Sequence, residues 1–248
     1  MSEIFENKKY KDLIKASLEK NREEFCPFRK EMQMDYLFSF LKKDFTNKKL
    51  KILDACCGYG RLIHFLNEFN PSQNYIGVDY VEELITEGKK RFSDYNNISF
   101  EHYDVMVLEN KYNKDFDIAI NYKTLSWLPY YTTIIQQLVK ATKHKIYITS
   151  LFYDGDIDFI TKIYKEAKTN GEDNFSFLNT YSLPKFKEYC FSIGAKEVNA
   201  IDMTLDVDLA KNDDLNVLQT YTVETRNKRL EITGNVILNW KLIEIILS

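Results

Sequence analysis

The chain has 248 residues, of which 44% are hydrophobic and 29% are charged, as is typical of a folded globular protein. A net charge of −3 argues against a nucleic-acid partner, because nucleic-acid binders usually carry a basic face. The chain lacks an apolar stretch of membrane-spanning or signal-peptide length, so we expect no membrane partner and a cytoplasmic location. The cysteines lack zinc spacing, so we expect free thiols and no bound metal at Cys26, Cys56, Cys57 and Cys190.

Residues 1–49 are predicted to form an N-terminal helical cap, with amphipathic helices over 8–21 and 28–43. We expect this cap to act as a lid over a ligand bound by the rest of the chain. In the second helix, apolar residues recur at helical spacing at Met32, Tyr36, Leu37 and Phe40.

From residue 50, short apolar runs alternate with helical stretches. Such alternation predicts right-handed crossovers and a parallel sheet with helices on both faces. We therefore predict an α/β, Rossmann-like fold with a mostly parallel sheet of seven strands. The first five strands are expected at 51–55, 74–79, 98–103, 116–121 and 145–150, and the helices between them at about 60–69, 81–93 and 130–142.

After residue 150 the pattern changes again. Two helices are predicted, over 158–168 and 182–194. Ser182 can cap the second helix, and Gly194 stands where that helix would end. The remaining elements are strands over 196–205 and 239–247 and a hairpin of 217–224 with 228–234. We interpret 50–248 as one domain with a late β insertion at about 206–238.

Two glycines, Gly58 and Gly60, follow the first predicted strand in the string LDACCGYGR. A strand, a glycine turn and a helix together bring bare backbone and helix N–H groups against a ligand. The second strand ends in Asp79, where an acidic residue can accept both ribose hydroxyls of a nucleoside. The alternatives are a tight turn without a ligand and a helix N-cap at Asp79.

Ile63 indicates which kind of nucleoside ligand the turn can bind. A dinucleotide-binding turn has a third glycine there, so Ile63 argues against a pyrophosphate and against an NAD-dependent oxidoreductase or epimerase. Asp54, at the end of the first strand, suits a cationic ligand better than a phosphate. S-adenosylmethionine has an α-amino group, a sulfonium and no phosphate.

The string from Leu53 to Arg61 resembles motif I of the class I S-adenosylmethionine-dependent methyltransferases, L-D-x-G-x-G-x-G. Cys56 replaces the first glycine of that motif, and the resemblance covers about residues 50–150. It implies S-adenosylmethionine as the cofactor and a contact with its methionine part. The residues implied in this turn are Asp54, Ala55, Cys56, Gly58 and Gly60.

The resemblance also implies how the rest of the cofactor is held. Asp79 would hold the ribose and Tyr80 would lie along the adenine. Asp104 would accept from the adenine amino group, with the backbone of Val105 donating beside it, although a turn-forming role is the alternative for Asp104. Asn121, at the tip of the fourth strand, would lie near the transferring methyl group.

Two arginines are candidates for pairing the methionine carboxylate, because a guanidinium fork suits a carboxylate. Arg29 lies on the helix before the first strand, and Arg61 follows the glycine turn. Ordinary surface arginines are the alternative for both.

The sequence is less informative about a general base. We expect structural roles for His64, His102 and His144, because none is placed clearly at the carboxyl tip of a strand. The better catalytic candidates are Tyr153 and Asp154, which follow the fifth strand. The alternative for them is a solvated loop with a helix cap.

The acceptor is predicted to be an oxygen or nitrogen atom of a small polar metabolite. The string after the fourth strand, Asn121 to Thr124, lacks the paired prolines typical of methyltransferases that act on nucleic-acid bases. An aromatic string, Trp127 to Tyr131, is a candidate wall of the acceptor site, with helix packing as the alternative. The alternative hypotheses for the function are an RNA or protein methyltransferase and a non-catalytic nucleoside-binding module.

A surface-glycan precursor is the finer prediction for the acceptor. The strings LSWLP (125–129) and SLFY (150–153) resemble those of bacterial methyltransferases associated with surface polysaccharides. The insertion adds polar residues suited to such an acceptor, although it can instead cover a sheet edge or form a dimer interface. We expect a monomer or a homodimer. The polar residues of the insertion are Tyr221, Thr222, Glu224, Arg226 and Arg229.

Overall fold

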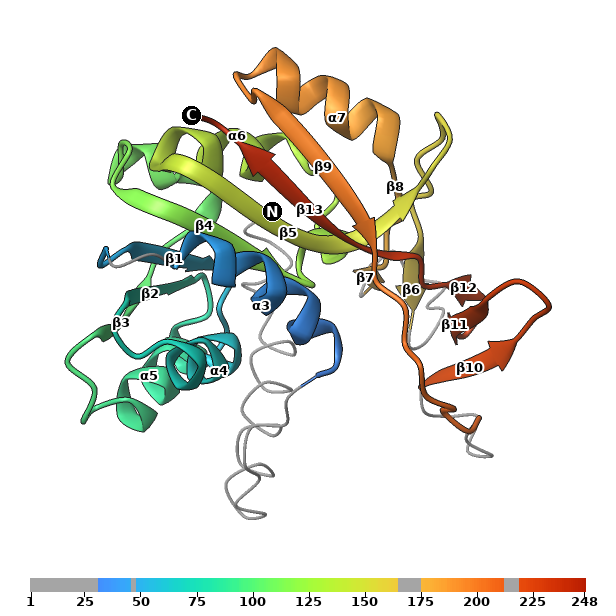
Figure 1. The fold of residues 1–248 in the computed structure, drawn as a ribbon, viewed down its shortest axis with the longest axis horizontal. Helices are drawn as coiled ribbons and strands as arrows, with labels where there is room; N and C mark the ends of the chain where they lie inside the picture. The colour runs from blue at the N-terminus through green and yellow to red at the C-terminus, as the bar shows by residue number, and fades with distance from the viewer. Residues whose placement is uncertain (1–30, 46–47, 165–174, 212–218) are drawn as a thin grey trace, which may run out of the picture.

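A computed structural model of the chain describes residues 31–45, 48–164, 175–211 and 219–248. Its main feature is a sheet of strand order β3-β2-β1-β4-β5-β13-β9, with a short β8 paired to β5 (Figure 1). Strands β1 to β5 run parallel, and β13 runs antiparallel between β5 and β9. The predicted α/β fold, with a mostly parallel sheet of seven strands, is confirmed, and β8 adds an eighth.

The strands of this sheet lie close to their predicted positions. The largest difference is at β5, which begins before and ends after the predicted 145–150. The bounds are β1 Lys51–Ala55, β2 Asn74–Asp79, β3 Ile98–His102, β4 Phe116–Tyr122, β5 Thr142–Tyr153, β8 Tyr181–Ser182, β9 Glu197–Asp202 and β13 Trp240–Ile246.

Helices cover both faces of the sheet, as the alternating pattern predicts. Successive residues of a strand point to opposite faces, so Ile52 and Leu53 of β1 enter different cores. One core packs α3, α4 and α5 against the sheet, and the other packs α6 and α7. The bounds are α3 Gln33–Asp44, α4 Arg61–Phe69, α5 Glu82–Arg91, α6 Thr132–Ala141 and α7 Leu183–Ser192, with short 3₁₀ turns η1 Val105–Asn110 and η2 Leu125–Trp127.

Of the predicted helical cap, the described part is α3. The predicted helix at 8–21 and the start of the one at 28–43 lie outside the described residues. The apolar stripe of α3 is fully part of the core, and Phe38 stacks on Phe69 of α4 with ring centroids 5.1 Å apart. Its buried apolar residues are Met34, Leu37, Phe38 and Leu41.

The prediction of a helix over 158–168 is wrong for the described residues 158–164. Phe159 forms an isolated antiparallel bridge with Thr180. Lys162–Tyr164 form β6, which pairs antiparallel with β7 (Phe175–Phe177). Ile163 packs against the core while its two neighbours are exposed, which is the period-two burial of a strand. Residues 165–168 lie outside the described part.

The late insertion contains the predicted hairpin and one more short strand. β10 (Thr220–Glu224), β11 (Arg229–Thr233) and β12 (Val236–Ile237) form a separate antiparallel sheet. Figure 1 shows this sheet beyond the end of β5, beside the start of β13. The chain then enters the core at Leu238 and Trp240, so the insertion is anchored at the carboxyl edge of the parallel strands.

None of the described helices is long and apolar enough to cross a membrane.

The predicted N-cap and C-terminal end of α7 are confirmed. Oγ of Ser182 accepts a hydrogen bond from the backbone N–H of Lys185 at 3.3 Å. Gly194 follows the helix with φ +106°, in the left-handed region that favours glycine.

Candidate functional site

The turn between β1 and α4 is folded against the end of β2. The N–H groups of Cys56 and Cys57 both donate to the carbonyl of Val78, at 2.8 and 3.1 Å. Cys56 has φ +64°, Gly58 +56° and Gly60 +91°, so all three are left-handed. Cys56, which replaces the first glycine of motif I, thus keeps a backbone conformation that favours glycine.

The two glycines of the turn serve different purposes. A Cβ built on Gly60 would lie 2.5 Å from the ring of Phe100, so close packing requires glycine there. A Cβ built on Gly58 would meet nothing within 4 Å. The turn is therefore packed on its Gly60 side and open at Gly58, where a ligand can approach the backbone closely.

Asp79 connects the end of β2 to this open side. Its Oδ2 accepts from the Gly58 N–H at 2.8 Å, and its Oδ1 accepts from the Val81 N–H at 2.9 Å. The N-cap residue of α5 is Val81, without a side-chain cap, so Asp79 is not the N-cap. The backbone N–H of Tyr80 also donates to this carboxylate. A carboxylate has about four acceptor positions, so acceptor capacity remains for a ribose hydroxyl.

Asp54 and Asn121 lie buried at the ends of β1 and β4. The Nδ2 of Asn121 donates to the carbonyl of Ala55 at 2.9 Å, which fixes β4 against the glycine turn. Its Oδ1 is buried without a hydrogen-bond partner among the described residues, and the Asn121 side chain also bonds Cys56, which lowers the pKa of that thiol. Oδ2 of Asp54 has no hydrogen-bond partner among the described residues, and Asp54 is only 3% exposed. A buried carboxylate of this kind calls for a donor or a cation.

Three carboxylates from three strand ends act on one thiol. Burial raises the pKa of Cys56 well above its usual value, and the charges of Asp79, Asp54 and Asp104 raise it further. Burial likewise raises the pKa of Asp54, and the nearby charge of Asp79 adds to the rise. The structure thus brings the predicted acids of β1, β2 and the residues after β3 into one electronegative site. The ammonium and sulfonium groups of S-adenosylmethionine fit that charge.

At the end of β3, Asp104 also has the turn-forming role that was its alternative. Its Oδ1 accepts from the Met106 N–H at 2.8 Å at the start of η1. Val105 is buried beside it, and its side chain belongs to the core. The predicted adenine contacts therefore lie together at the end of β3, with Asp104 already fixed by its own turn.

One of the expectations for the histidines needs correction. β3 ends at His102, so this residue does stand at the carboxyl tip of a strand. Its Nε2 lies 2.8 Å from the carbonyl oxygen of Tyr80, and the two rings meet edge to face. His102 thus positions Tyr80, the residue predicted to lie along the adenine.

The other two histidines lie away from the carboxyl tips of the strands. His64 contacts Glu68 at 3.4 Å, and His144 contacts Ser248 at the far end of the sheet.

A charge cluster that sequence reasoning missed surrounds Glu31. The carboxylate pairs with Arg61 at 2.9 Å and with Lys123 at 2.6 Å, and accepts from the Tyr122 hydroxyl at 3.0 Å. Burial alone would raise the pKa of Glu31, but Lys123 and Arg61 outweigh it and hold the pKa below its usual value. Arg61 is thus already paired to a carboxylate, whereas Arg29 lies outside the described residues.

The two catalytic candidates lie at the end of β5, at the carboxyl edge of the sheet. The exposed Asp154 pairs with Lys241 at 3.0 Å, and the same ammonium also bonds Asp202. Tyr153 meets Phe159 edge to face, with ring centroids 5.3 Å apart. Asp154 is therefore held by a cation rather than free to act as a base, and the catalytic roles of both residues stay predictions.

The aromatic string after β4 divides into two parts. Trp127 and Tyr130 are 46% and 54% exposed, whereas Leu128 and Tyr131 are buried in the core. Tyr131 packs edge to face against Tyr181. The string therefore packs the next elements, as its alternative predicts, and its role as a wall of the acceptor site stays a prediction.

The insertion's two arginines differ in their surroundings. Arg229 pairs with Asp206 at 3.0 Å and Asp208 at 3.2 Å, so its charge is neutralised within the insertion. Arg226 is exposed at the turn between β10 and β11. Of the two arginines, only Arg226 has a charge that is available to a phosphorylated acceptor. This weakens the argument for a glycan precursor.

Comparison with known proteins points to one family. A family model described as a methyltransferase domain matches residues 46–214. Malonyl-[acyl-carrier protein] O-methyltransferase of Bacillus anthracis is 24% identical over 166 residues, which are 67% of this chain and 54% of that protein. The Acetivibrio thermocellus protein of the same name is 27% identical over 124 residues, 50% of this chain and 42% of its own. The chain spans about half the length of these curated relatives.

Solved structures share the fold. Magnesium protoporphyrin IX methyltransferase from Synechocystis PCC 6803 with bound SAH aligns with a TM-score of 0.54 at 13% identity, over 94% of each chain. A putative S-adenosylmethionine-dependent methyltransferase from Listeria monocytogenes aligns with a TM-score of 0.54 at 13% identity, over 85% of this chain and 97% of that one. At such identities the likeness concerns the fold. With the family match over most of the chain, it leads to one conclusion: this chain belongs to the methyltransferase-domain family and has the fold of the class I S-adenosylmethionine-dependent methyltransferases.

Proposed function

We propose that the chain binds S-adenosylmethionine at the carboxyl ends of β1 to β4 and methylates an oxygen or nitrogen atom of a small acceptor. The observation that carries this proposal is the group of acids around the open glycine turn, which includes the Oδ2 of Asp54 that no described residue bonds. In this arrangement Asp54 faces the cationic methionine part, Asp79 the ribose, and Asp104 with Val105 the adenine.

The cofactor supplies the activated methyl group and its leaving group, so the protein's work is alignment and exclusion of water. Asn121 fixes the end of β4 against the turn through its bond to the Ala55 carbonyl. Tyr80 is held by His102. These bonds keep the cofactor contacts in place before an acceptor arrives. Less conformational entropy is then lost at the reaction step.

For the acceptor, we propose a small metabolite that lies over the ends of β4 and β5. The exposed rings of Trp127, Tyr130 and Tyr153 favour an acceptor with an apolar part. A surface-glycan precursor stays the finer proposal, supported by the resemblance of residues 125–129 and 150–153 and by the exposed Arg226. The curated relatives are named for malonyl groups on acyl-carrier protein, so a malonyl thioester belongs among the compounds to test.

A methyl-transfer screen read by mass spectrometry tests this proposal. The chain is incubated with S-adenosylmethionine and sugar nucleotides, amino sugars, small amines or malonyl thioesters. A gain of one methyl group in one class, lost in Asp54→Asn, supports the proposal. Asp94→Asn, an exposed carboxylate after α5, is the matched control and should keep the activity. Methylation of RNA or protein in place of every small compound would contradict it.

A further inference from the structure

A buried carboxyl group of the insertion lies outside every role assigned above. Glu231, on β11, is only 6% exposed, yet no described residue donates a hydrogen bond to its carboxylate or forms an ion pair with it. Its carbonyl accepts from the Leu238 N–H at 2.8 Å, which holds β11 over the chain that enters β13. A largely buried acid that no described residue pairs with can take a hydrogen bond or a proton from a bound ligand.

The surroundings of Glu231 place it at the carboxyl edge of the parallel strands. The charged groups that act on it are Lys123, which follows β4, and Glu31. Lys123 is engaged elsewhere, because its ammonium pairs with Glu31 at 2.6 Å and lies 4.7 Å from the ring centroid of Trp240. Lys123 is also two residues beyond Asn121, which bonds the glycine turn. The insertion therefore brings a carboxyl group to the same strand end as the proposed cofactor site.

We infer that Glu231 contacts the methyl acceptor and receives the proton that the acceptor loses. This inference rests on the proposed function. The acceptor's hydroxyl or ammonium hydrogen bonds to the Glu231 carboxylate. An ammonium passes its proton to Glu231 before the attack, which frees the nitrogen lone pair, and a hydroxyl passes its proton as its oxygen attacks. As the acceptor atom bonds to the methyl carbon, the carbon–sulfur bond breaks and its electron pair stays on sulfur. The products are the methylated acceptor, S-adenosylhomocysteine and protonated Glu231.

The electrostatics suit this role. Burial raises the pKa of Glu231 to about 7, Lys123 opposes the rise and Glu31 adds to it. A carboxylate that titrates near neutrality is a better proton acceptor than an exposed glutamate and is still largely ionised at slightly basic pH. Asp154, by contrast, is paired with Lys241, so Glu231 is the stronger candidate for the base.

The test compares two ligands that need no acceptor. Sinefungin is S-adenosylhomocysteine with an aminomethylene group in place of the sulfur, so its ammonium projects toward the acceptor position. Calorimetry measures both affinities from pH 6 to 8. We expect the sinefungin-to-S-adenosylhomocysteine affinity ratio to rise about tenfold as Glu231 ionises, because one proton is linked to binding. Effects on Asp54 and Asp79 that both ligands share cancel in the ratio.

Variants identify the group responsible. Glu231→Gln should give a low, pH-independent ratio with S-adenosylhomocysteine affinity unchanged, and Glu231→Asp should keep the pH dependence. Glu197→Gln, at an exposed position where β9 begins, is the control and should behave as the parent protein. A constant ratio in the parent protein, or a Glu231→Gln ratio that still rises, overturns the inference. Failure of S-adenosylhomocysteine itself to bind would instead contradict the proposed function.

Discussion

At the scale of single residues, the site is organised by acids that form no ion pair with a cation among the described residues. Asp54 and Asp79 are close enough for the charge of Asp79 to raise the pKa of Asp54, and both are buried. Two carboxylates in such surroundings are unfavourable in the ligand-free protein. A ligand with two positive centres and several hydroxyl donors relieves this, so the unfavourable charge indicates which kind of ligand the turn holds.

Asp79→Asn is expected to weaken S-adenosylmethionine binding by about 1–3 kcal/mol, the range for hydrogen bonds to charged groups. The amide keeps the size of the side chain but loses an acceptor for the ribose and for the Gly58 N–H. Calorimetry measures the affinity, and thermal unfolding checks that the variant is folded. A folded variant with parental affinity would remove Asp79 from the site.

Cofactor affinity is expected to rise between pH 5 and pH 7.5. Burial raises the folded-state pKa of both Asp54 and Asp79, so in the free protein they hold protons at a pH where ordinary aspartates have lost them. A cationic ligand favours their ionised form, so binding releases protons and is favoured as pH rises. Calorimetry in two buffers of different ionisation enthalpy measures the protons released. Proton uptake at pH 6 would contradict this account.

At the scale of elements, α3 is part of the core rather than a separate cover. Its apolar stripe packs with residues of β1, α4 and β13. Asp44, its last residue, pairs with Lys145 at 2.6 Å and bonds the Tyr147 hydroxyl, both on β5. The helix therefore connects the N-terminal part of the chain to the middle of the sheet.

Leu37→Ala is expected to lower the free energy of unfolding by about 2–5 kcal/mol, because it removes a fully buried side chain from a packed core. Lys42→Ala, on the exposed side of α3, is the matched control and should change stability by less than about 0.5 kcal/mol. Urea unfolding followed by circular dichroism gives both values. Equal stabilities for the two variants would mean that α3 is not integrated in the core.

Most strands and helices were predictable because their burial follows a simple period along the sequence. The parallel strands are short apolar runs, and Ser182 with Gly194 marks both ends of α7. The error at 158–164 has a physical cause. DFITKIYKEAK has a helix-like spacing of apolar residues, but Phe159 bridges Thr180 and Lys162–Tyr164 pair with β7. No local pattern shows these contacts.

The candidate site likewise has residues that the sequence predicts and residues that it does not predict. Asp54, Asp79 and Asp104 were predictable because each stands at the end of a strand, and parallel strands end at one edge. The contacts of Glu31 with Lys123 and of Asp154 with Lys241 join residues far apart in the sequence, and no motif marks them. Glu231 was missed for the same reason, because its burial depends on how the insertion packs.

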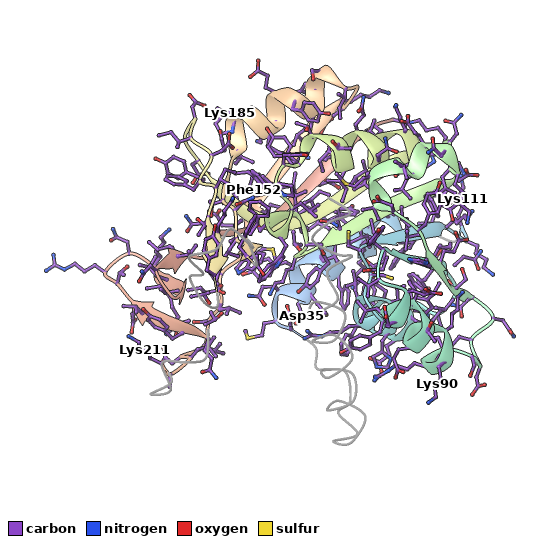
Figure 2. All side chains as sticks on the ribbon, turned by 180° about the vertical axis from the view of Figure 1, so that it is seen from behind. Asp35, Lys90, Lys111, Phe152, Lys185 and Lys211 are labelled. Atoms are coloured by element: carbon purple, nitrogen blue, oxygen red, sulfur yellow. The ribbon has the colours of Figure 1, made fainter. Side chains whose placement is uncertain are left out.

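At the scale of the whole molecule, the chain is a parallel α/β sheet with additions at both ends of the sequence. Figure 2 shows this from behind, with Asp35 of α3 near the middle and Lys211 of the insertion at the opposite side from Lys90 and Lys111. The added elements thus lie at different places around one sheet. Their roles in binding are therefore separable by experiment.

A chain that begins at residue 31 is expected to fold and to bind the cofactor more weakly than the full chain. It keeps α3 and therefore the buried stripe of this helix, and it lacks the rest of the proposed lid, including Arg29. Thermal unfolding tests the fold and calorimetry tests the affinity. Parental affinity in the shortened chain would rule out a lid role for residues 1–30.

The most direct test of the account is calorimetric titration of the full chain with S-adenosylhomocysteine and, separately, with NAD. The account predicts one bound S-adenosylhomocysteine per chain, no measurable binding of NAD, and loss of most of the affinity in Asp54→Asn and Asp79→Asn. Binding of NAD in place of S-adenosylhomocysteine, or full affinity in both variants, would contradict a methyl-donor site at the glycine turn.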